Sequence, residues 1–330
     1  MLTSGLPEIP FERLGSSGLD LLAARQPERQ LALLDAGRKK LTPAGLAFLD
    51  RRSKAWSLRT NNPYHGEIDA IAENAPACGT WFMNFCYEWG CTAGLKPTGG
   101  APTLLRTLDW PFDCVGRSVV VAERDGGAGP YWLITWPGHV GAITVMAPGR
   151  FSVAINQAPM RRRTPLLALD WLLDRCSVRK STALPPAQLL RRVADCAKNF
   201  EEAVDQLSHT EIALPVIFSV AGMQADDSVI LERTERQASI RKGTVAAANH
   251  WSGFVMPQRD RGHQSAVRQE EMMAFLADTT ADPHDLAWLS PPILNEDTRL
   301  AAVMDQLQRK LTVLGLEADG TTTQILHLTH

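Results

Sequence analysis

The sequence lacks the short motifs that would assign a metal or nucleotide chemistry directly. It has no Cys-x-x-Cys pair and no His-Glu-x-x-His pair, so we expect neither a structural zinc nor a zinc-peptidase site. It also has no Gly-x-Gly-x-x-Gly run and no phosphate-binding loop, which leaves nucleotide binding without support. We therefore expect a protein that requires no cofactor and no metal.

Cysteines and long apolar runs are also scarce. The six cysteines are scattered along 330 residues and do not have the spacing of a disulfide framework. The longest apolar runs, such as residues 212–221, are too short to cross a bilayer. The first residues lack the basic start and apolar core of a signal peptide. These absences predict a cytoplasmic protein without stable membrane insertion.

Charge and composition exclude further classes of partner. The formal net charge is −2, and the three arginines at 161–163 form too short a run to indicate nucleic-acid binding. A hydrophobic fraction of 45% provides enough apolar material for a large core. We therefore expect a globular protein that acts on a small molecule, and we leave homo-oligomerisation open.

The residue pattern predicts a mixture of helices and strands. The chain reads as helical up to about Leu58, with Thr42 as an N-cap and Pro43 at the first helical position. The aromatic-rich residues 79–88 favour a strand. Glycine and proline turns then separate short strands, which indicates antiparallel pairing. These strands are expected over residues 104–110, 118–122, 131–136, 140–146, 151–156, 216–220, 228–232 and 238–241, with a closing strand over 322–328.

Four further helices are predicted after residue 160. Residues 165–173 are apolar nearly all round, which favours a buried helix, whereas residues 186–207 have the spacing of one amphipathic helix. Residues 265–276 and 298–311 also show helical spacing. This order of elements predicts an α+β protein in which sheets are covered by helices.

One short segment carries the chemistry. Gly90 precedes Cys91, Arg106 follows Cys91 by 15 residues, and Asp109 lies three residues further on. A free thiol titrates near about 8.5, whereas an α-amino group, at roughly 7.7 to 8.0, can serve as the base for its own side chain. Only cleavage before Cys91 creates that amine, and Gly90 leaves its carbonyl open to attack because it has no Cβ. The residues therefore suggest a self-cleaving cysteine nucleophile.

The segments around this junction resemble a known family. Residues 87–93 (YEWGCTA) and 105–110 (LRTLDW) are similar to the "YE…CTS" and "RN-D" patterns of acid ceramidases and N-acylethanolamine acid amidases. These are relatives of choloylglycine hydrolases and of penicillin acylases and acyltransferases. Ala93 and Thr107 depart from the pattern, which has serine and asparagine there. Residues 62–72, 148–156, 248–251 and 265–268 resemble further family elements, so the resemblance covers about residues 62–270.

The resemblance implies a fold and a reaction. It implies a four-layer αββα N-terminal-nucleophile hydrolase, with residues 1–90 as a helical propeptide and 91–330 as the catalytic domain. The two segments would stay associated after cleavage between Gly90 and Cys91. The mature enzyme would hydrolyse a linear carbon–nitrogen amide bond of an N-acyl substrate with a lipophilic or aryl acyl group. Acyl transfer by the same fold remains an alternative.

The expected site residues have separate roles. Cys91 is the nucleophile, Arg106 favours its thiolate, and Asp109 holds the new amine. On a strand, Arg106 and Asp109 would face opposite sides, so a turn or bulge near residues 107–109 is expected if both reach Cys91. The resemblance assigns the oxyanion donor to Asn249 and the pocket wall to Asn156. Arg268 is the expected late arginine, with Arg259 and Arg261 as competitors.

Two other functions stay open. An intact thiol hydrolase would pair Cys91 with a histidine, for which His139, His250 and His263 are the candidates. A non-catalytic protein that binds an apolar ligand would leave Cys91 inert, since a buried cysteine is usually a small core residue.

Overall fold

The computed structural model describes residues 5–330, so the first four residues of the predicted 1–90 segment lie outside it. The N-terminal part is helical, as predicted, but begins with a strand that the sequence pattern did not indicate. Thr42 caps α3 by accepting a hydrogen bond from the Gly45 amide, with Pro43 next to it. The elements are β1 (Phe11–Gly15), α1 (Leu19–Arg25), α2 (Pro27–Leu41), α3 (Pro43–Arg59), α4 (His65–Asn74) and α5 (Thr80–Phe85).

The predicted strand over residues 79–88 is wrong, because α5 occupies most of it. Its aromatic residues pack as helical neighbours: Trp81 stacks on Phe85, and Phe85 meets the Trp56 ring of α3 at 5.2 Å. A short apolar run has no period that separates a buried strand from a buried helix, so tertiary packing decides.

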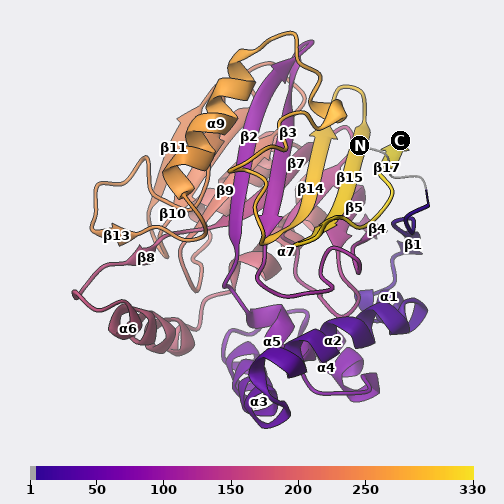
Figure 1. Ribbon diagram of the computed structural model, residues 1–330, viewed down its shortest axis with the longest axis vertical. Helices are drawn as coiled ribbons and strands as arrows, with labels where there is room; N and C mark the ends of the chain where they lie inside the picture. The colour runs from indigo at the N-terminus through magenta and orange to yellow at the C-terminus, as the bar shows by residue number, and fades with distance from the viewer. Residues whose placement is uncertain (1–4) are drawn as a thin grey trace.

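Two antiparallel sheets form the centre of the molecule (Figure 1). The first has the order β1-β4-β5-β6-β7-β9-β10-β11, and only its edge pair β1–β4 is parallel. Its strands after β1 are β4 (Val120–Gly126), β5 (Gly129–Thr135), β6 (Thr144–Ala147), β7 (Phe151–Gln157), β9 (Val216–Ala221), β10 (Ser228–Arg233) and β11 (Ala238–Lys242). These match the expected strands.

The second sheet carries the Cys91 junction. Its order is β12-β2-β3-β14-β15, with β16 and β17 also paired to β15. Its strands are β2 (Gly90–Thr98), β3 (Ala101–Asp109), β12 (Val245–Ala247), β14 (Thr298–Asp305), β15 (Lys310–Glu317), β16 (Gly320–Thr321) and β17 (Leu326–Thr329); β8 (Met160–Arg161) and β13 (Gln258–Arg259) form a separate pair. The strand β2 was not among the predicted elements.

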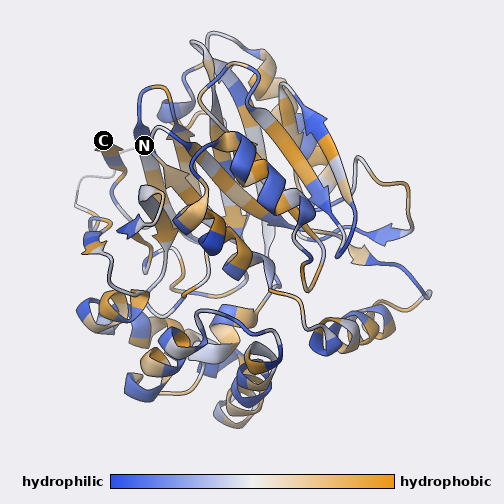
Figure 2. Ribbon diagram, turned by 180° about the vertical axis from the view of Figure 1, so that it is seen from behind, coloured by the Kyte–Doolittle hydropathy of each residue, from blue (hydrophilic) through white to orange (hydrophobic). Residues whose placement is uncertain are grey.

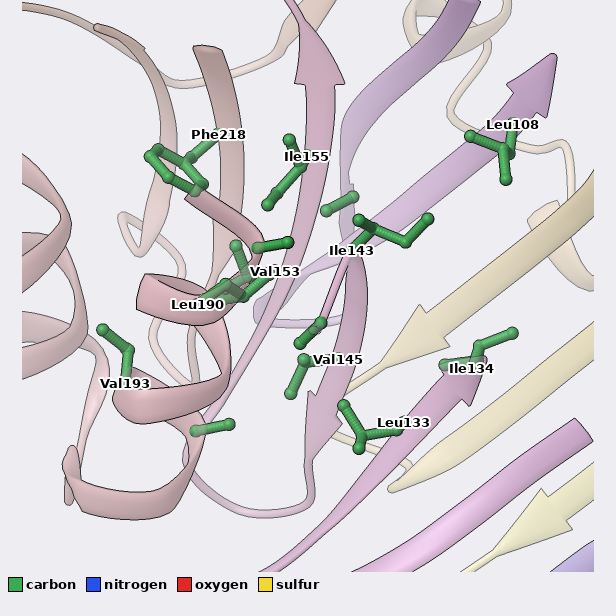
Figure 3. Packing of buried hydrophobic residues seen from close by; sticks show 14 of the residues in the cluster. Leu108, Leu133, Ile134, Ile143, Val145, Val153, Ile155, Leu190, Val193 and Phe218 are labelled. Atoms are coloured by element: carbon green, nitrogen blue, oxygen red, sulfur yellow. The ribbon is translucent and has the colours of Figure 1, made fainter. Parts of the chain in front are cut away.

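Helices cover the outer faces of both sheets. The helices α7 (Pro186–Cys196) and α8 (Phe200–His209) lie on the first sheet, and α9 (Ser265–Ala277) lies on the second. The layers are therefore helix, sheet, sheet, helix, as predicted. Figure 3 shows Leu190 of α7 beside Val153 of β7, and both belong to the core that also fills the space between the sheets. A second apolar core lies between the second sheet and α9.

The helix predicted over residues 298–311 is wrong, because this segment forms β14 and the start of β15. Its apolar residues serve both faces of the sheet. Leu300 and Met304 belong to the core between the sheets, whereas Ala301 and Val303 belong to the core under α9. A strand buried on both faces does not alternate between apolar and polar residues, which allowed a helical reading.

Two other helical predictions need correction. The predicted helix over 186–207 is divided into α7 and α8, because the Asn199 side chain accepts a hydrogen bond from the Glu202 amide and caps a new helix. The helix α6 (Leu167–Lys180) exists, but it is not buried. It projects from the body of the molecule (Figures 1 and 2), and Leu167 and Trp171 are exposed. A one-turn 3₁₀ segment, Pro283–Asp285, follows α9. Within residues 5–330, no helix is both long and apolar enough to cross a bilayer.

Candidate functional site

Cys91 is the second residue of β2, and its side chain points into the space between the two sheets. Its thiol is fully buried and donates a hydrogen bond to the Ile155 carbonyl of β7 at 3.5 Å. The Arg106 guanidinium donates from Nη2 to the same sulfur at 3.3 Å. Burial raises the pKa of the Cys91 thiol above its ordinary value, and the Arg106 charge opposes this rise.

Arg106 is a fully buried cation that the two sheets hold in place. It lies on β3, diagonally across from Cys91 on the same face, because Cys91 pairs with Leu108 in the β2–β3 register. Its Nη1 donates to the Thr144 hydroxyl at 2.6 Å and to the Ile143 carbonyl at 3.2 Å. Among the described residues, no carboxylate lies within 4.0 Å of Arg106. Its positive charge is therefore not neutralised by an ion pair and can stabilise a Cys91 thiolate directly.

Asp109 faces the opposite side of β3, toward α9. The bulge expected near residues 107–109 is absent there: β2 and β3 pair in continuous register through Asp109, and the irregularity lies in β14, between Thr298 and Leu300. The Asp109 carboxylate accepts from the Thr298 hydroxyl at 2.9 Å and lies 3.3 Å from Nη1 of Arg268. Burial raises the pKa of Asp109, while the Arg268 charge lowers it.

Gly90 pairs directly with Asp109 and has no room for a side chain. A Cβ at Gly90 would lie 3.3 Å from the Asp109 carboxylate and 3.3 Å from the Gly262 Cα. At such short distances these neighbours would have to shift by a few tenths of an ångström. The absence of a side chain at Gly90 therefore brings the Asp109 carboxylate next to the Gly90–Cys91 junction.

Asn249 and Arg268 hold the main chain of Cys91. Oδ1 of Asn249 accepts from the Cys91 amide at 2.8 Å and from Nη2 of Arg268 at 2.9 Å. Nδ2 of Asn249 donates to the Gln157 carbonyl at 2.8 Å. Nη1 of Arg268 donates to the Cys91 carbonyl at 2.6 Å and to the Thr92 hydroxyl at 2.8 Å. These side chains thus contact the main chain on both sides of the Cys91 Cα: Asn249 binds the amide, and Arg268 of α9 binds the carbonyl.

The two competing arginines lie elsewhere. Arg259 pairs with Asp170 at 2.8 Å, at the start of α6. Arg261 pairs with Glu88 at 2.8 Å, two residues before Gly90. Of the three late arginines, Arg268 is the one that contacts Cys91.

Asn156 lies beside Ile155 on β7 and is completely buried. Its Nδ2 donates to the Ala247 and Ala248 carbonyls, but its Oδ1 has no hydrogen-bond partner within residues 5–330. Within the same residues, Nε of Arg106 also lacks a hydrogen-bond partner, whereas Oδ2 of Asp109 has its ion pair with Arg268. Buried polar atoms are almost always paired in folded proteins, so two unpaired ones, on Asn156 and Arg106, are consistent with a functional site here.

Three supporting residues were missed in the sequence. Thr298 binds Asp109, but its segment was read as a helix. Ser265 belongs to the segment 265–268 that resembles a family element, but no role was predicted for it. Its hydroxyl accepts a hydrogen bond from the Asn249 amide at 2.8 Å and contacts Nδ1 of His250 at 2.8 Å. Gln157 follows Asn156, and its side chain binds the backbone of Trp89 at 3.0 Å. The Thr298 and Gln157 contacts leave no spacing signal, because they join segments that are 189 and 68 residues apart in the chain.

Among residues 5–330, no histidine forms a hydrogen bond with the Cys91 sulfur. Within residues 5–330, the hydrogen-bond partners of the Cys91 sulfur are Arg106 and the Ile155 carbonyl. His139 is buried beside Trp136, and burial lowers its pKa to about 4. His250 is bound to Ser265, and His263 is exposed. The geometry therefore gives no support to a Cys–His pair.

Comparisons with known proteins agree with this arrangement. No family model matches the chain. The acid ceramidase of Heterocephalus glaber is 25% identical over 179 residues, which cover 52% of this chain and 44% of that protein. Human acid ceramidase is 27% identical over 104 residues, covering 32% and 25%, respectively. The chain thus matches less than half of the length of these relatives.

The fold is found in a solved structure. The N-acylethanolamine-hydrolyzing acid amidase ortholog of Caenorhabditis elegans superposes with a TM-score of 0.53 at 17% identity, covering 72% of this chain and all of that one. This likeness confirms the predicted four-layer αββα fold. The sequence similarity to acid ceramidases likewise agrees with the family resemblance.

Proposed function

We propose that this acid ceramidase-like chain, which has the fold of N-terminal-nucleophile hydrolases, is a cysteine amidase that cuts itself before Cys91 and then hydrolyses an N-acyl amide. The observation that carries the proposal is the set of contacts at one residue. The Cys91 thiol lies 3.3 Å from the buried guanidinium of Arg106. Asn249 and Arg268 bind the main-chain amide and carbonyl of Cys91, respectively. A core cysteine needs none of these contacts.

The first reaction is self-cleavage. The Cys91 sulfur attacks the Gly90 carbonyl, the carbon–nitrogen bond between the two residues breaks, and the acyl group moves to sulfur. The nitrogen takes up a proton and becomes the α-amino group of Cys91. Water then hydrolyses the thioester, which releases the Gly90 carboxylate. The Arg106 cation supports this sequence because it favours the thiolate form in a buried site.

The second reaction repeats the chemistry on a substrate. The new amine serves as the base for the thiol, and Asp109 accepts its hydrogen bonds. The closeness of Gly90 to the Asp109 carboxylate supports this role, because cleavage frees the chain end beside that carboxylate. Asn249 would donate its remaining Nδ2 proton to the oxyanion, and Asn156 would line the pocket. Arg268 would hold Asp109, Asn249 and the Cys91 carbonyl together.

The expected substrate is a small N-acyl amide with a lipophilic or aryl acyl group. The similarity to acid ceramidases and to an N-acylethanolamine-hydrolyzing acid amidase supports this substrate class. Acyl transfer to an amine is the alternative outcome of the same thioester. The cytoplasmic location and any homo-oligomer stay predictions.

A panel of N-acyl amides tests the proposed activity. The processed protein should release free acid and amine from at least one amide with a lipophilic or aryl acyl group. Cys91→Ala should abolish this turnover, because it removes the nucleophile. Cys196→Ala changes an exposed cysteine away from the site and should leave turnover unchanged. Equal activity in Cys91→Ala and the wild type would overturn the proposal.

A further inference from the structure

The residues just before the junction are held in the way that an enzyme holds a bound ligand. Residues 87–90 are called the leader tail here. The Glu88 carboxylate accepts from Nε1 of Trp171 at 2.8 Å and from Nη1 of Arg261 at 2.8 Å, and it also forms an ion pair with Arg175. Two arginines and an indole N–H around one carboxylate constitute an anion-binding site.

The backbone of the leader tail is bound as well. The Gln157 side chain accepts from the Trp89 amide at 3.0 Å and donates to the Tyr87 carbonyl. One carboxamide thus pairs with an N–H and a C=O of an extended chain, as it would with an amide-bearing ligand. Gln157 is almost completely buried at the end of β7.

The binding groups and the bound segment lie on opposite sides of the proposed cut. Trp171 and Arg175 belong to α6, and Arg261 follows β13, so all of them are in the 91–330 segment. The leader tail belongs to the 1–90 segment. Cleavage turns the tail into the free end of a separate chain, which can leave the site.

Departure of the tail would leave two cations without partners. The side chains of Arg175 and Arg261 are each 18% exposed, and Glu88 is the one carboxylate that forms an ion pair with either of them within residues 5–330. The nearby Asp174 is paired with Arg163, and Glu235 is paired with Arg161. Burial already lowers the pKa of Arg175 to about 10. Largely buried cations are costly without a counter-charge, so the open site favours a new anion.

We propose that the leader tail is a built-in substrate mimic and that the substrate is an N-acyl amide whose acyl part carries an anionic group, bound by Trp171, Arg175 and Arg261. This inference rests on the proposed self-cleavage. It places the anion on the acyl side because Glu88 lies on that side of the Gly90–Cys91 bond. Three residues span at most about 10 Å, which sets the reach between the anion site and the thiol.

Three matched probes test the proposal on processed wild-type enzyme. The first is the p-nitroanilide of N-acetyl-Glu-Trp-Gly, and the second replaces its glutamate by the isosteric glutamine. The third is N-acetyl-Gln-Trp-Gly joined to 4-aminobenzoate, which moves the charge to the amine side. We expect kcat/KM for the first probe to exceed that of each of the others at least tenfold, mainly through KM.

Variants of the anion site provide the second readout. Arg261→Gln and Arg175→Gln should each reduce the preference for the glutamate probe over the glutamine probe to twofold or less. Arg259→Gln is the control, because Arg259 lies two residues away and pairs with Asp170 instead. It should keep the full preference. All rates are measured per processed molecule, so any slower self-cleavage does not enter.

The possible failures are distinguishable. Equal kcat/KM for the first two probes, or an undiminished preference in Arg261→Gln, overturns the anionic substrate while leaving the amidase intact. Turnover of other N-acyl amides without turnover of the glutamate probe does the same. A preference for the aminobenzoate probe overturns the acyl-side assignment. Uncut protein that hydrolyses none of the amides overturns both this inference and the proposed function.

Discussion

Two arginines act on Cys91 from opposite faces of the same strand. Arg106 reaches the thiol in the space between the sheets, whereas Arg268 reaches the carbonyl on the α9 side. The first can influence how readily the sulfur ionises, and the second fixes the peptide that contains it. The two contacts therefore predict different consequences for substitution.

Loss of the charge at Arg106 should change the pH dependence of self-cleavage. Burial raises the pKa of the Cys91 thiol and Arg106 lowers it, so removal of the cation raises it further. The cleavage rate should increase with pH as the thiolate forms, and Arg106→Gln should move this increase to higher pH. The measurement follows freshly translated precursor between about pH 6 and 9.5. Arg150→Gln, at a partly buried arginine elsewhere, should keep the wild-type profile. Superimposable profiles for Arg106→Gln and wild type would remove Arg106 from the mechanism.

Asn249→Ala should reduce turnover more than thiol reactivity. Its side-chain N–H is the proposed oxyanion donor, and such a donor is usually worth about a hundred- to a thousandfold in rate. Alkylation of Cys91 forms no oxyanion, so its rate in the processed enzyme should barely change. Turnover is measured per processed molecule, because self-cleavage passes through a similar intermediate. Unchanged turnover would show that Asn249 is not the donor.

The site could be predicted from the sequence only in part. Cys91, Arg106, Asp109 and Arg268 are close together in space, and the spacing of the first three was visible in the chain. Contacts between segments that are far apart in the sequence produce no recognisable spacing of residues. Gln157 reaches Trp89 across 68 residues, and a lone glutamine next to Asn156 gave no signal.

At the scale of elements, the N-terminal helices are tied to the catalytic layers by a buried ion pair. Glu67 of α4 pairs with Arg191 of α7 at 2.9 Å, and the Arg191 side chain is 1% exposed. The guanidinium also lies 4.1 Å from the Tyr64 ring centroid, and Tyr64 donates to Asp195 at 2.9 Å. This contact joins the two segments that the proposed cut would separate.

Glu67→Gln should destabilise the protein strongly. It leaves Arg191 as a buried charge without its partner, a change that typically costs about 3–5 kcal/mol. Asp69→Asn is the matched control on the same helix, because Asp69 pairs with the more exposed Lys54. Its expected cost is about 0–1 kcal/mol. Urea unfolding at neutral pH measures both, and equal costs would contradict this account of the contact.

The secondary-structure predictions were wrong where burial removed the usual periodicity of apolar and polar residues. Most strands of the first sheet were predicted to within a few residues, because glycine and proline turns separate them. In β14 both faces are buried, so the alternation that identifies a strand is missing. In α6 the opposite occurs: its leucines suggested burial, but the helix lies outside the core. Apolar residues alone do not specify which surface covers them.

At the scale of the whole molecule, residues 5–90 do not form a separable unit. The strand β1 extends the first sheet by pairing in parallel with β4, and α2, α3 and α5 enclose a cavity with Trp110 and Trp136. The two segments therefore share a sheet and an apolar core. Two pieces produced by a cut at Gly90 should stay together without any covalent link.

Mass and N-terminal sequence of the active enzyme test the central claim most directly. Denatured wild-type protein should give two masses, those of residues 1–90 and 91–330, and the larger piece should begin with the free amine of Cys91. The same sample should elute as one particle under native conditions, and Cys91→Ala should remain a single intact chain. Active wild-type protein that shows only the uncut mass would contradict the account.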